Sequence, residues 1–262
     1  MTLFSANLGF LWQALPLPDA IRAAKAAGFD AVECHYPYDV PVEAVREALK
    51  ETGFTMLGLN TTRGNAATGD NGLAAVPGRE DEARRAIEQA IEYAAAIGTP
   101  NVHVMAGKSS GEAGRATFVA NLQYACGLAA KAGIFILIEP LNHRDAPGYF
   151  LQTSEQALEI IDAVGARNIR LMFDCYHLQI MQGDLTRRLQ AYLNSIGHIQ
   201  IASVPDRREP DHGEIDYRYI LTFLKELGYD RPIGAEYRPA KSTDEGLQWL
   251  KDFKEKTTPR LA

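Results

Sequence analysis

Four short apolar runs in the second half of the chain each end in a side chain that carries an oxygen donor. The runs are ILIE, LMFD, HIQ and IGAE, and they end at Glu139, Asp174, Gln200 and Glu236, which are 35, 26 and 36 residues apart. Adjacent strands of a sheet lie about 4.8 Å apart, so side chains at matching strand ends can converge on one point. Three carboxylates confined there would repel one another, and a divalent cation among them removes that repulsion.

The donor types at this predicted site narrow the choice of ion. A glutamine that binds through its carbonyl adds a fourth oxygen to the three carboxylates, and oxygen-only sites suit Mg²⁺ or Mn²⁺. Zn²⁺ instead prefers sites that include histidine or cysteine. A single acidic residue at a strand end is more often a helix cap or a solvated charge, so the prediction depends on the four occurring together. We predict a Mg²⁺ or Mn²⁺ site formed by Glu139, Asp174, Gln200 and Glu236.

Glycines divide the chain into units that would carry these strand ends. Segments rich in helix formers are closed by Gly28, Gly53, Gly98, Gly133, Gly165, Gly197 and Gly228. A short β-type run follows each glycine: AVECHY, TMLGLN, NVHVM, IFILIEP, IRLMFD, HIQIA and PIGAEY. Glycine commonly ends a helix in the left-handed conformation, and repeated alternation of helix and strand is typical of βα units. With the opening run LFSANL, eight strands are expected.

Eight βα units in 262 residues match a closed (β/α)8 barrel, so we predict an α/β fold with a single TIM-barrel domain over residues 1–262. Residues from about 252 to 262 are expected to form a C-terminal tail. Helical periodicity is clearest in the stripe Ala83, Ala86, Ile87, Ala90, Ile91, Ala94 and Ile97, and Thr153 with Gln156 forms a capping box. A doubly wound open sheet is disfavoured because no GxGxxG or GxxxxGK[ST] motif follows an early strand.

Charge and composition narrow the class of protein. A net charge of -6 and a pI near 5.6 disfavour binding to nucleic acid or to anionic membranes. No apolar run approaches the ~18 residues that a spanning helix needs, and the first residues lack the charged region of a secretory signal. Cys34, Cys126 and Cys175 lie far apart without CxxC spacing, as suits free thiols in a reducing cytoplasm. We expect a cytoplasmic protein, and a homo-oligomer is left open.

Motifs along nearly the whole chain carry a resemblance to a known group of enzymes. They are FSANL, AGFDAVE, PGRE, IEPLNH, FDCYH, HIQIA, VPDRREPDHGEIDY and GAEYRP. In this order they resemble the hydroxypyruvate isomerases and 2-oxo-tetronate isomerases of the xylose-isomerase-like barrels. The resemblance implies that Glu139 and Glu236 transfer protons and that the four strand-end residues hold the metal. Sugar epimerases of the same superfamily usually have histidine at the third metal position, so Gln200 marks the hydroxypyruvate and oxo-tetronate branch.

The implied reaction interconverts hydroxypyruvate and tartronate semialdehyde through an enediolate. A metal that binds both oxygens stabilises that anion, while one glutamate removes a proton and the other returns one to the neighbouring carbon. A hydroxy-keto acid substrate also needs partners for its carboxylate and oxygens. His177, Arg207 and Lys108 are the candidates, against the alternatives of a loop-stabilising histidine, a solvated arginine and a surface lysine. Arg208 is adjacent to Arg207, so the choice of arginine is open.

Other functions fit parts of the same pattern. A 2-oxo-tetronate isomerase or a ketose 3-epimerase would use the same site on another substrate. A catalytically silent sugar-acid binding barrel would be expected to have lost Glu139 or Glu236, and both are present. An abasic-site endonuclease on this fold needs several zinc ions, many histidine ligands and a basic groove, whereas this acidic chain has six histidines. A Cys175–His177 nucleophile is disfavoured because Asp174 already has a better role.

Overall fold

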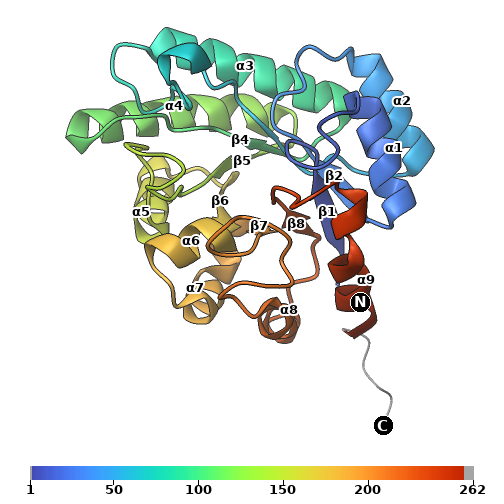
Figure 1. The fold of residues 1–262 in the computed structure, drawn as a ribbon. Helices are drawn as coiled ribbons and strands as arrows, with labels where there is room; N and C mark the ends of the chain where they lie inside the picture. Colours follow the sequence, from blue (N-terminus) through green and yellow to red (C-terminus); the bar gives the residue numbers. More distant parts are fainter. Residues whose placement is uncertain (1, 257–262) are drawn as a thin grey trace.

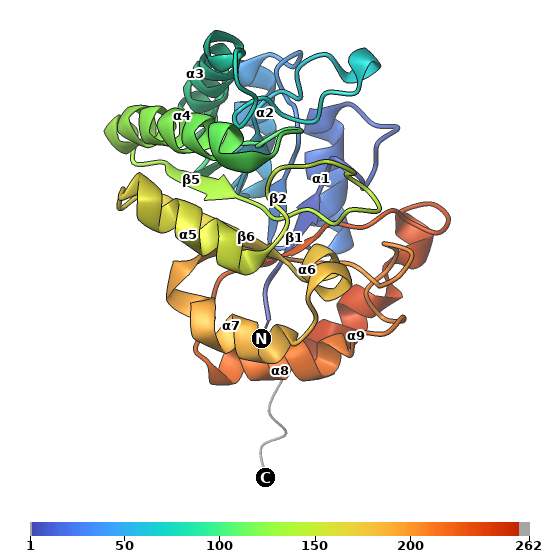
Figure 2. The ribbon, with the colours of Figure 1, turned by 90° about the vertical axis from the view of Figure 1, so that its left-hand side faces the viewer.

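The computed structural model describes residues 2–256, in which strands alternate with helices that surround them (Figure 1). The strands are β1 (Phe4–Asn7), β2 (Ala31–Glu33), β3 (Leu59–Asn60), β4 (Asn101–His103), β5 (Phe135–Ile138), β6 (Ile169–Asp174), β7 (Ile196–Ile201) and β8 (Ile233–Ala235). The α-helices are α1 (Leu17–Ala27), α2 (Val42–Thr52), α3 (Glu80–Ile97), α4 (Gly111–Lys131), α5 (Ser154–Val164), α6 (Cys175–Met181), α7 (Leu185–Tyr192), α8 (Tyr217–Glu226) and α9 (Gln248–Lys256). Figure 2 shows α3, α4 and α5 side by side on one flank of the sheet. None of the helices in this part of the chain is long and apolar enough to cross a lipid bilayer.

The eight parallel strands form one sheet in the order β2-β1-β8-β7-β6-β5-β4-β3. The two ends of this order meet where Val32 of β2 pairs in parallel with Met56, just before β3. Across this seam the Val32 N–H donates to the Thr55 carbonyl at 3.2 Å, and the Leu57 N–H donates to the Val32 carbonyl at 2.7 Å. These bonds bring the sheet to a nearly closed barrel, and the predicted single-domain (β/α)8 TIM barrel is confirmed.

Glycine ends several helices as the sequence predicts, because a residue without Cβ adopts the left-handed conformation at little cost. The C-caps Gly28, Gly53, Gly98 and Gly165 have φ angles of 93°, 67°, 72° and 67°. The prediction is wrong for Gly197, which is the second residue of β7. A Cβ at this position would lie 2.4 Å from Leu137 Cδ2 and 2.7 Å from Arg170 Cβ, so this glycine permits close packing inside the barrel.

The predicted helical patterns form at α3 and at the start of α5. The apolar stripe of α3 is buried along its whole length: Ala83, Ala86, Ile87, Ala90, Ile91, Ala94 and Ile97. The Thr153 hydroxyl accepts a hydrogen bond from the Gln156 N–H at 3.2 Å. The return bond of the capping box comes from the Gln152 N–H, 2.9 Å from Gln156 Oε1, and not from Thr153 itself. Thr153 is therefore the N-cap that the sequence predicts, and only the return bond of the box comes from the preceding residue.

The C-terminal helix α9 packs beside β1 through aromatic side chains (Figure 1). Trp249 and Phe253 lie one turn apart and are 0% and 3% exposed. Their ring centroids lie 5.4 and 6.4 Å from that of Phe4 at the start of β1. The predicted tail from about residue 252 is therefore corrected: the helix continues to Lys256 because Phe253 completes this contact. Residues 257–262 lie outside the described part of the chain.

Candidate active site

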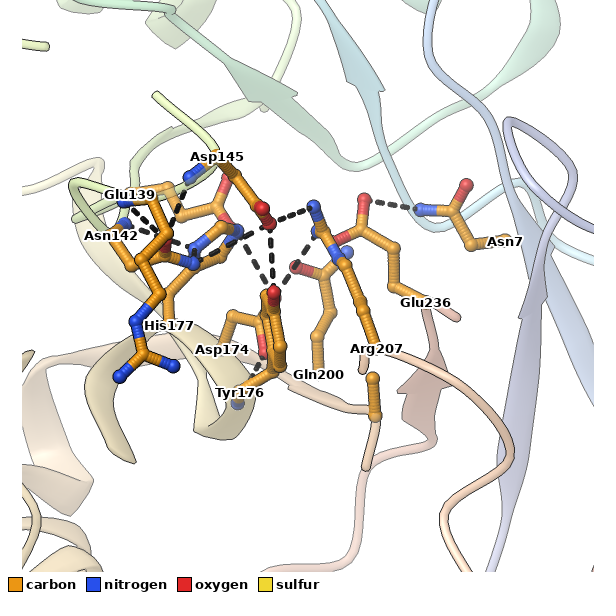
Figure 3. Close-up of polar contacts among 12 residues, drawn as sticks. Asn7, Glu139, Asn142, Asp145, Asp174, Tyr176, His177, Gln200, Arg207 and Glu236 are labelled. Atoms are coloured by element: carbon orange, nitrogen blue, oxygen red, sulfur yellow. Dashed lines mark hydrogen bonds and ion pairs between the residues drawn. The ribbon is translucent and has the colours of Figure 1, made fainter. Parts of the chain in front are cut away.

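The four predicted metal ligands lie at the carboxyl ends of strands β5 to β8. Asp174 and Gln200 belong to β6 and β7, where they are paired in register. Glu139 and Glu236 directly follow β5 and β8. All four side chains are buried, and Figure 3 shows them converging from different strands on one space. The barrel thus brings together residues that lie up to 97 positions apart in the sequence.

Three buried oxygen atoms at this site have no hydrogen-bond partner among the described residues. They are Glu139 Oε1, Asp174 Oδ2 and Gln200 Oε1. A buried acceptor without a partner costs about 1–3 kcal/mol, so three such atoms at one site indicate a missing cation or donor. Carboxylate and amide oxygens are the ligands that Mg²⁺ and Mn²⁺ prefer. The residues present therefore fit the predicted ion.

His177 lies beside the same oxygens and at first resembles a metal ligand. Its Nε2 is 3.6 Å from Asp174 Oδ2 and 3.9 Å from Glu139 Oε1, and the three potential ligand atoms all lie within 4.8 Å of one another. However, the backbone N–H of Asn142 donates to His177 Nδ1 at 3.0 Å, so the neutral ring carries its proton on Nε2. Burial, and next the charge of Arg207, lowers the pKa of His177 well below its usual value. His177 is therefore a neutral N–H donor that faces the site.

The surroundings of the two glutamates at this site shift their pKa values in opposite directions. Glu236 accepts hydrogen bonds from Asn7 Nδ2 at 3.0 Å, His35 Nε2 at 2.9 Å and Arg207 at 2.8 Å. Burial alone would raise the pKa of Glu236, but Arg207 and then His35 hold it well below its usual range. Burial raises the pKa of Glu139 well above its usual value, and the charge of Glu236 adds to this effect. Opposite shifts of this kind are typical of carboxyl pairs that take part in acid–base catalysis.

Asp174 connects the site to the first turn of α6. Its Oδ1 accepts the Tyr176 N–H at 2.8 Å and caps the helix, while its Oδ2 has no partner. Burial raises the pKa of Asp174 to about 8, although Arg207 opposes the shift. Without a cation, this carboxyl group therefore keeps its proton at neutral pH. Burial also raises the pKa of the adjacent Cys175 thiol well above its usual value, which disfavours a thiolate nucleophile here.

Arg207 is held over the site by an unusual backbone conformation and two aromatic rings. Its φ of 53° lies in the left-handed region, which is uncommon for a residue with a Cβ. The guanidinium carbon lies 4.9 Å from the ring centroid of Phe10 and 5.0 Å from that of Tyr176. One of its nitrogens pairs with Glu236 at 2.8 Å. The side chain of Arg208 is 44% exposed, so Arg207 is the member of the pair that faces the site.

A cavity of about 970 Å³ opens above these residues. This volume is near the upper end of the roughly 300–1,000 Å³ that ligand pockets span. Lys108 lines its wall with Arg63 and Arg238, so the third predicted substrate-binding residue faces the same space as His177 and Arg207. Cationic side chains therefore line the same cavity as the two glutamates.

Several residues of the site had no role predicted from the sequence. Asn7, His35 and His103 stand at the ends of predicted strands, and they contact the two glutamates at 2.9 to 3.6 Å. Asp145, in the loop after β5, lies 3.5 Å from Arg207. The strand-end position was a usable signal for the first three. Nothing in the local sequence distinguishes the loop aspartate from a solvated one.

The chain is similar to known proteins over nearly its whole length. Residues 21–253 match the family described as xylose isomerase-like TIM barrel. The 2-oxo-tetronate isomerase of Cupriavidus necator is 45% identical over 257 residues, which cover 97% of this chain and 99% of that protein. The hydroxypyruvate isomerase of Escherichia coli is 38% identical over 258 residues, which cover 97% of this chain and 100% of that protein.

Solved structures share the same fold. The structure described as AP endonuclease, family 2, from Brucella melitensis has a TM-score of 0.92 at 39% identity, covering 96% of this chain and 99% of that one. A 3-keto-D-glucoside 4-epimerase from Escherichia coli has a TM-score of 0.80 at 22% identity, with coverage of 96% and 99%. At that identity the second likeness concerns the fold alone.

Proposed function

The chain belongs to the xylose isomerase-like TIM barrel family, and from that premise we propose that it is a metal-dependent isomerase of hydroxypyruvate. The two curated relatives are named isomerases and match nearly the whole chain, so the chain is an isomerase. The proposed reaction interconverts hydroxypyruvate and tartronate semialdehyde. The observation that carries this proposal is the convergence of four buried oxygen-donor side chains, from strands β5 to β8, on one space that holds three unpartnered oxygens.

The predicted ligands would hold Mg²⁺ or Mn²⁺ at the mouth of the barrel. They are Glu139, Asp174, Gln200 and Glu236. When bound, such an ion supplies Lewis-acid stabilisation of the negative charge that develops on the substrate oxygens. The free oxygens of Glu139, Asp174 and Gln200 support this assignment. Glu236 would bind the ion while it also accepts hydrogen bonds from its present donors.

The two glutamates divide the proton transfers between them. Glu236 takes a proton from C3 of hydroxypyruvate, and Glu139 gives one to C2. The hydroxyl proton on the C3 oxygen moves to the C2 oxygen, so the product has the same atoms and charge as the substrate. Exchange with solvent then restores the protonation of both glutamates. In the reverse direction their roles are exchanged.

The remaining polar groups bind and orient the substrate. His177 offers its Nε2–H to a substrate oxygen, which the neutral ring and its fixed tautomer support. Arg207 provides a planar fork that matches a carboxylate, and its two aromatic neighbours fix the plane of that fork. At present Arg207 balances the charge of Glu236 and lies 3.6 Å from Asp174. Lys108 on the cavity wall is a further candidate.

A second candidate function is isomerisation of a 2-oxo-tetronate, a four-carbon acid. The cavity volume and the cations on its wall favour it, as does the 45% identical relative of that name. A ketose 3-epimerase is a weaker alternative because a neutral sugar gives Arg207 no anion to pair. DNA cleavage is weaker still, since a net charge of -6 provides no general attraction for phosphate backbones. We place the enzyme in the cytoplasm, which its three buried free cysteines support.

A substrate panel tests the proposal. The purified protein is assayed with hydroxypyruvate, a 2-oxo-tetronate and a neutral ketose, each with Mg²⁺, with Mn²⁺ and with EDTA. We expect metal-dependent turnover of one or both keto acids, well above turnover of the ketose. Binding of a keto acid without conversion would instead indicate a silent binding barrel. A preference for the ketose would indicate an epimerase.

A further inference from the structure

Gln200 is the one amide in the predicted ligand set, and the two ends of an amide differ. The carbonyl oxygen can bind a cation, whereas the NH₂ group cannot. Gln200 Nε2 donates to Glu33 Oε2 at 2.8 Å, and Gln200 Oε1 is buried without a partner in the described part of the chain. The flipped amide would press its oxygen against the Glu33 carboxylate and turn NH₂ toward the metal site. Glu33 therefore selects the orientation that a metal ligand needs.

Glu33 is itself held in position inside the barrel. It is the last residue of β2 and is 4% exposed. The Ser5 hydroxyl donates to its Oε1 at 3.1 Å, and His198 Nε2 lies 3.2 Å from its Oε2. Both carboxylate oxygens of Glu33 thus have partners. These contacts fix the position of Oε2, which accepts the hydrogen bond from Gln200.

Gly234 leaves the space through which Glu33 reaches Gln200. In the sheet, Gly234 of β8 pairs with Ser5 of β1 on one side and with Gln200 of β7 on the other. A Cβ at Gly234 would lie 2.1 Å from Glu33 Oε1 and 2.9 Å from Gln200 Cγ. Any larger residue at this position would push the carboxylate away, so the barrel interior is shaped around the contact between Glu33 and Gln200.

We propose that Glu33 is a positioning residue that presents the carbonyl oxygen of Gln200 to the divalent cation. The inference rests on the proposed metal site. It assigns a role to Glu33, which has none in the proposed function. Glu33 acts through Gln200 and does not touch the substrate. Groups that orient a metal ligand from behind typically change metal affinity by about 10- to 100-fold when they are removed.

Mn²⁺ affinity, measured by the electron paramagnetic resonance signal of the free ion, tests this role without any assay of activity. Glu33→Met removes the acceptor at similar length and should weaken Mn²⁺ binding about 10- to 100-fold. Glu33→Gln should stay within about threefold of the parent, because its carbonyl can accept from Gln200 while its NH₂ donates to Ser5. Ser5→Ala should weaken Mn²⁺ binding less than Glu33→Met, since Ser5 contacts only Oε1 of Glu33 and its loss leaves the acceptor of Gln200 in place.

The outcomes separate this role from the proposed function. A parent protein that does not bind Mn²⁺ would contradict the metal site itself. If the parent binds but Glu33→Met binds equally well, Glu33 does not position Gln200. If Glu33→Gln loses as much affinity as Glu33→Met, the charge of Glu33 matters and not its orienting bond, which also overturns the inference.

A second substitution at Gln200 gives an independent test. Gln200→Glu alone should weaken Mn²⁺ binding, because two carboxylates would then meet where the 2.8 Å bond is now. Combined with Glu33→Met it should bind more tightly than either single variant, since a carboxylate presents oxygen in both orientations. Additive losses would contradict the inference. If Glu33→Met does not fold, the double substitution is made with Glu33→Gln, whose amide can donate to the introduced carboxylate, and it should bind Mn²⁺ more tightly than Gln200→Glu alone.

Discussion

Two buried regions differ in how their polar groups are paired. One is the mouth of the barrel, and the other is the aromatic layer behind β1, formed by Phe4, Trp249 and Phe253. At the mouth, three oxygens lack partners among the described residues, and burial raises the pKa values of Glu139 and Asp174. In the aromatic layer, even the indole N–H of Trp249 is paired, with the Tyr237 hydroxyl at 3.2 Å. The mouth is arranged for a ligand and the layer for stability, so substitutions should separate the two properties.

Strand β1 contributes to both regions because its side chains alternate. Ser5 and Asn7 point into the barrel, where they donate to Glu33 and Glu236. Phe4 points outward and packs against α9. The division between function and stability therefore runs along the two faces of one strand, and not between separate segments of the chain.

The largest effect is expected at the mouth, from Glu236→Gln. Loss of a general base typically lowers turnover about 10²- to 10⁴-fold, and this substitution also removes a charge from the proposed metal site. The variant should still fold, because the side chain lies outside the apolar layers, although buried Arg207 loses the charge with which it pairs. Turnover and urea unfolding of the same preparation check both statements. A variant that isomerises hydroxypyruvate near the parental rate would show that Glu236 is not catalytic.

The opposite result is expected in the aromatic layer, from Trp249→Ala. Removing a fully buried tryptophan typically costs about 3–5 kcal/mol of stability. Turnover per folded molecule and Mn²⁺ affinity should remain parental, because α9 contributes no residue to the site. Urea unfolding and an active-site titration with Mn²⁺ measure the two quantities separately. A parallel loss of Mn²⁺ affinity would mean that the two regions are coupled.

Arg207→Ala sharpens the comparison because it removes the proposed partner of the substrate carboxylate in addition to the ion pair with Glu236. A charge-assisted hydrogen bond contributes roughly 1.5–3 kcal/mol, so turnover of hydroxypyruvate should fall about 10- to 150-fold with metal saturating. Turnover of a neutral ketose should fall much less. Arg208→Ala is the matched control and should behave like the parent, since that side chain is 44% exposed. Equal losses on the acid and the ketose would mean that Arg207 shapes the loop and does not bind the carboxylate.

The smallest effect is a pH dependence of stability that Asp174→Asn should remove. The pKa of Asp174 is raised to about 8 in the folded, metal-free protein. A raised pKa gives a contribution to stability that is complete below the unfolded value of about 3.9 and is lost as the pH rises through about 8. The free energy of unfolding of the variant, taken relative to that of the metal-free parent, should therefore rise between pH 5 and pH 8.5. The rise should be at least about 1.4 kcal/mol, the value of one pKa unit. Urea unfolding in EDTA measures the difference, and a constant difference would contradict the raised pKa.

Local signals in the sequence predict the barrel and most of the carboxylates. A strand end and a helix-capping glycine are each defined by a few neighbouring residues, so Asp174 and Gly98 can be read directly. The prediction of a helix end at Gly197 is wrong because close packing between strands requires a glycine there. The end of α9 is predicted as a tail because most of its residues are polar. Its one aromatic residue, Phe253, packs against Phe4 at the other end of the chain, and no local signal shows that contact.

The finer features of the site depend on contacts between distant residues. The tautomer of His177 is set by a backbone N–H that lies 35 residues earlier in the chain. Glu33 reads as an ordinary strand residue within AVECHY, and its bond to Gln200 spans 167 positions. Arg207 is distinguished from Arg208 by its contacts with the rings of Phe10 and Tyr176, whereas the Arg208 side chain is 44% exposed. Such features require the folded structure, because no short stretch of sequence contains both partners.

Deuterium labelling tests the central claim, proton transfer by two different glutamates, most directly. Hydroxypyruvate is isomerised in D₂O with Mg²⁺ or Mn²⁺, and early product is read by NMR against a sample without enzyme. Since Glu139 gives C2 a proton that exchanges with solvent, we expect tartronate semialdehyde with deuterium at C2, formed only when metal is present. A product whose C2 hydrogen comes from C3 of the substrate, with no solvent deuterium, would contradict the two-glutamate mechanism.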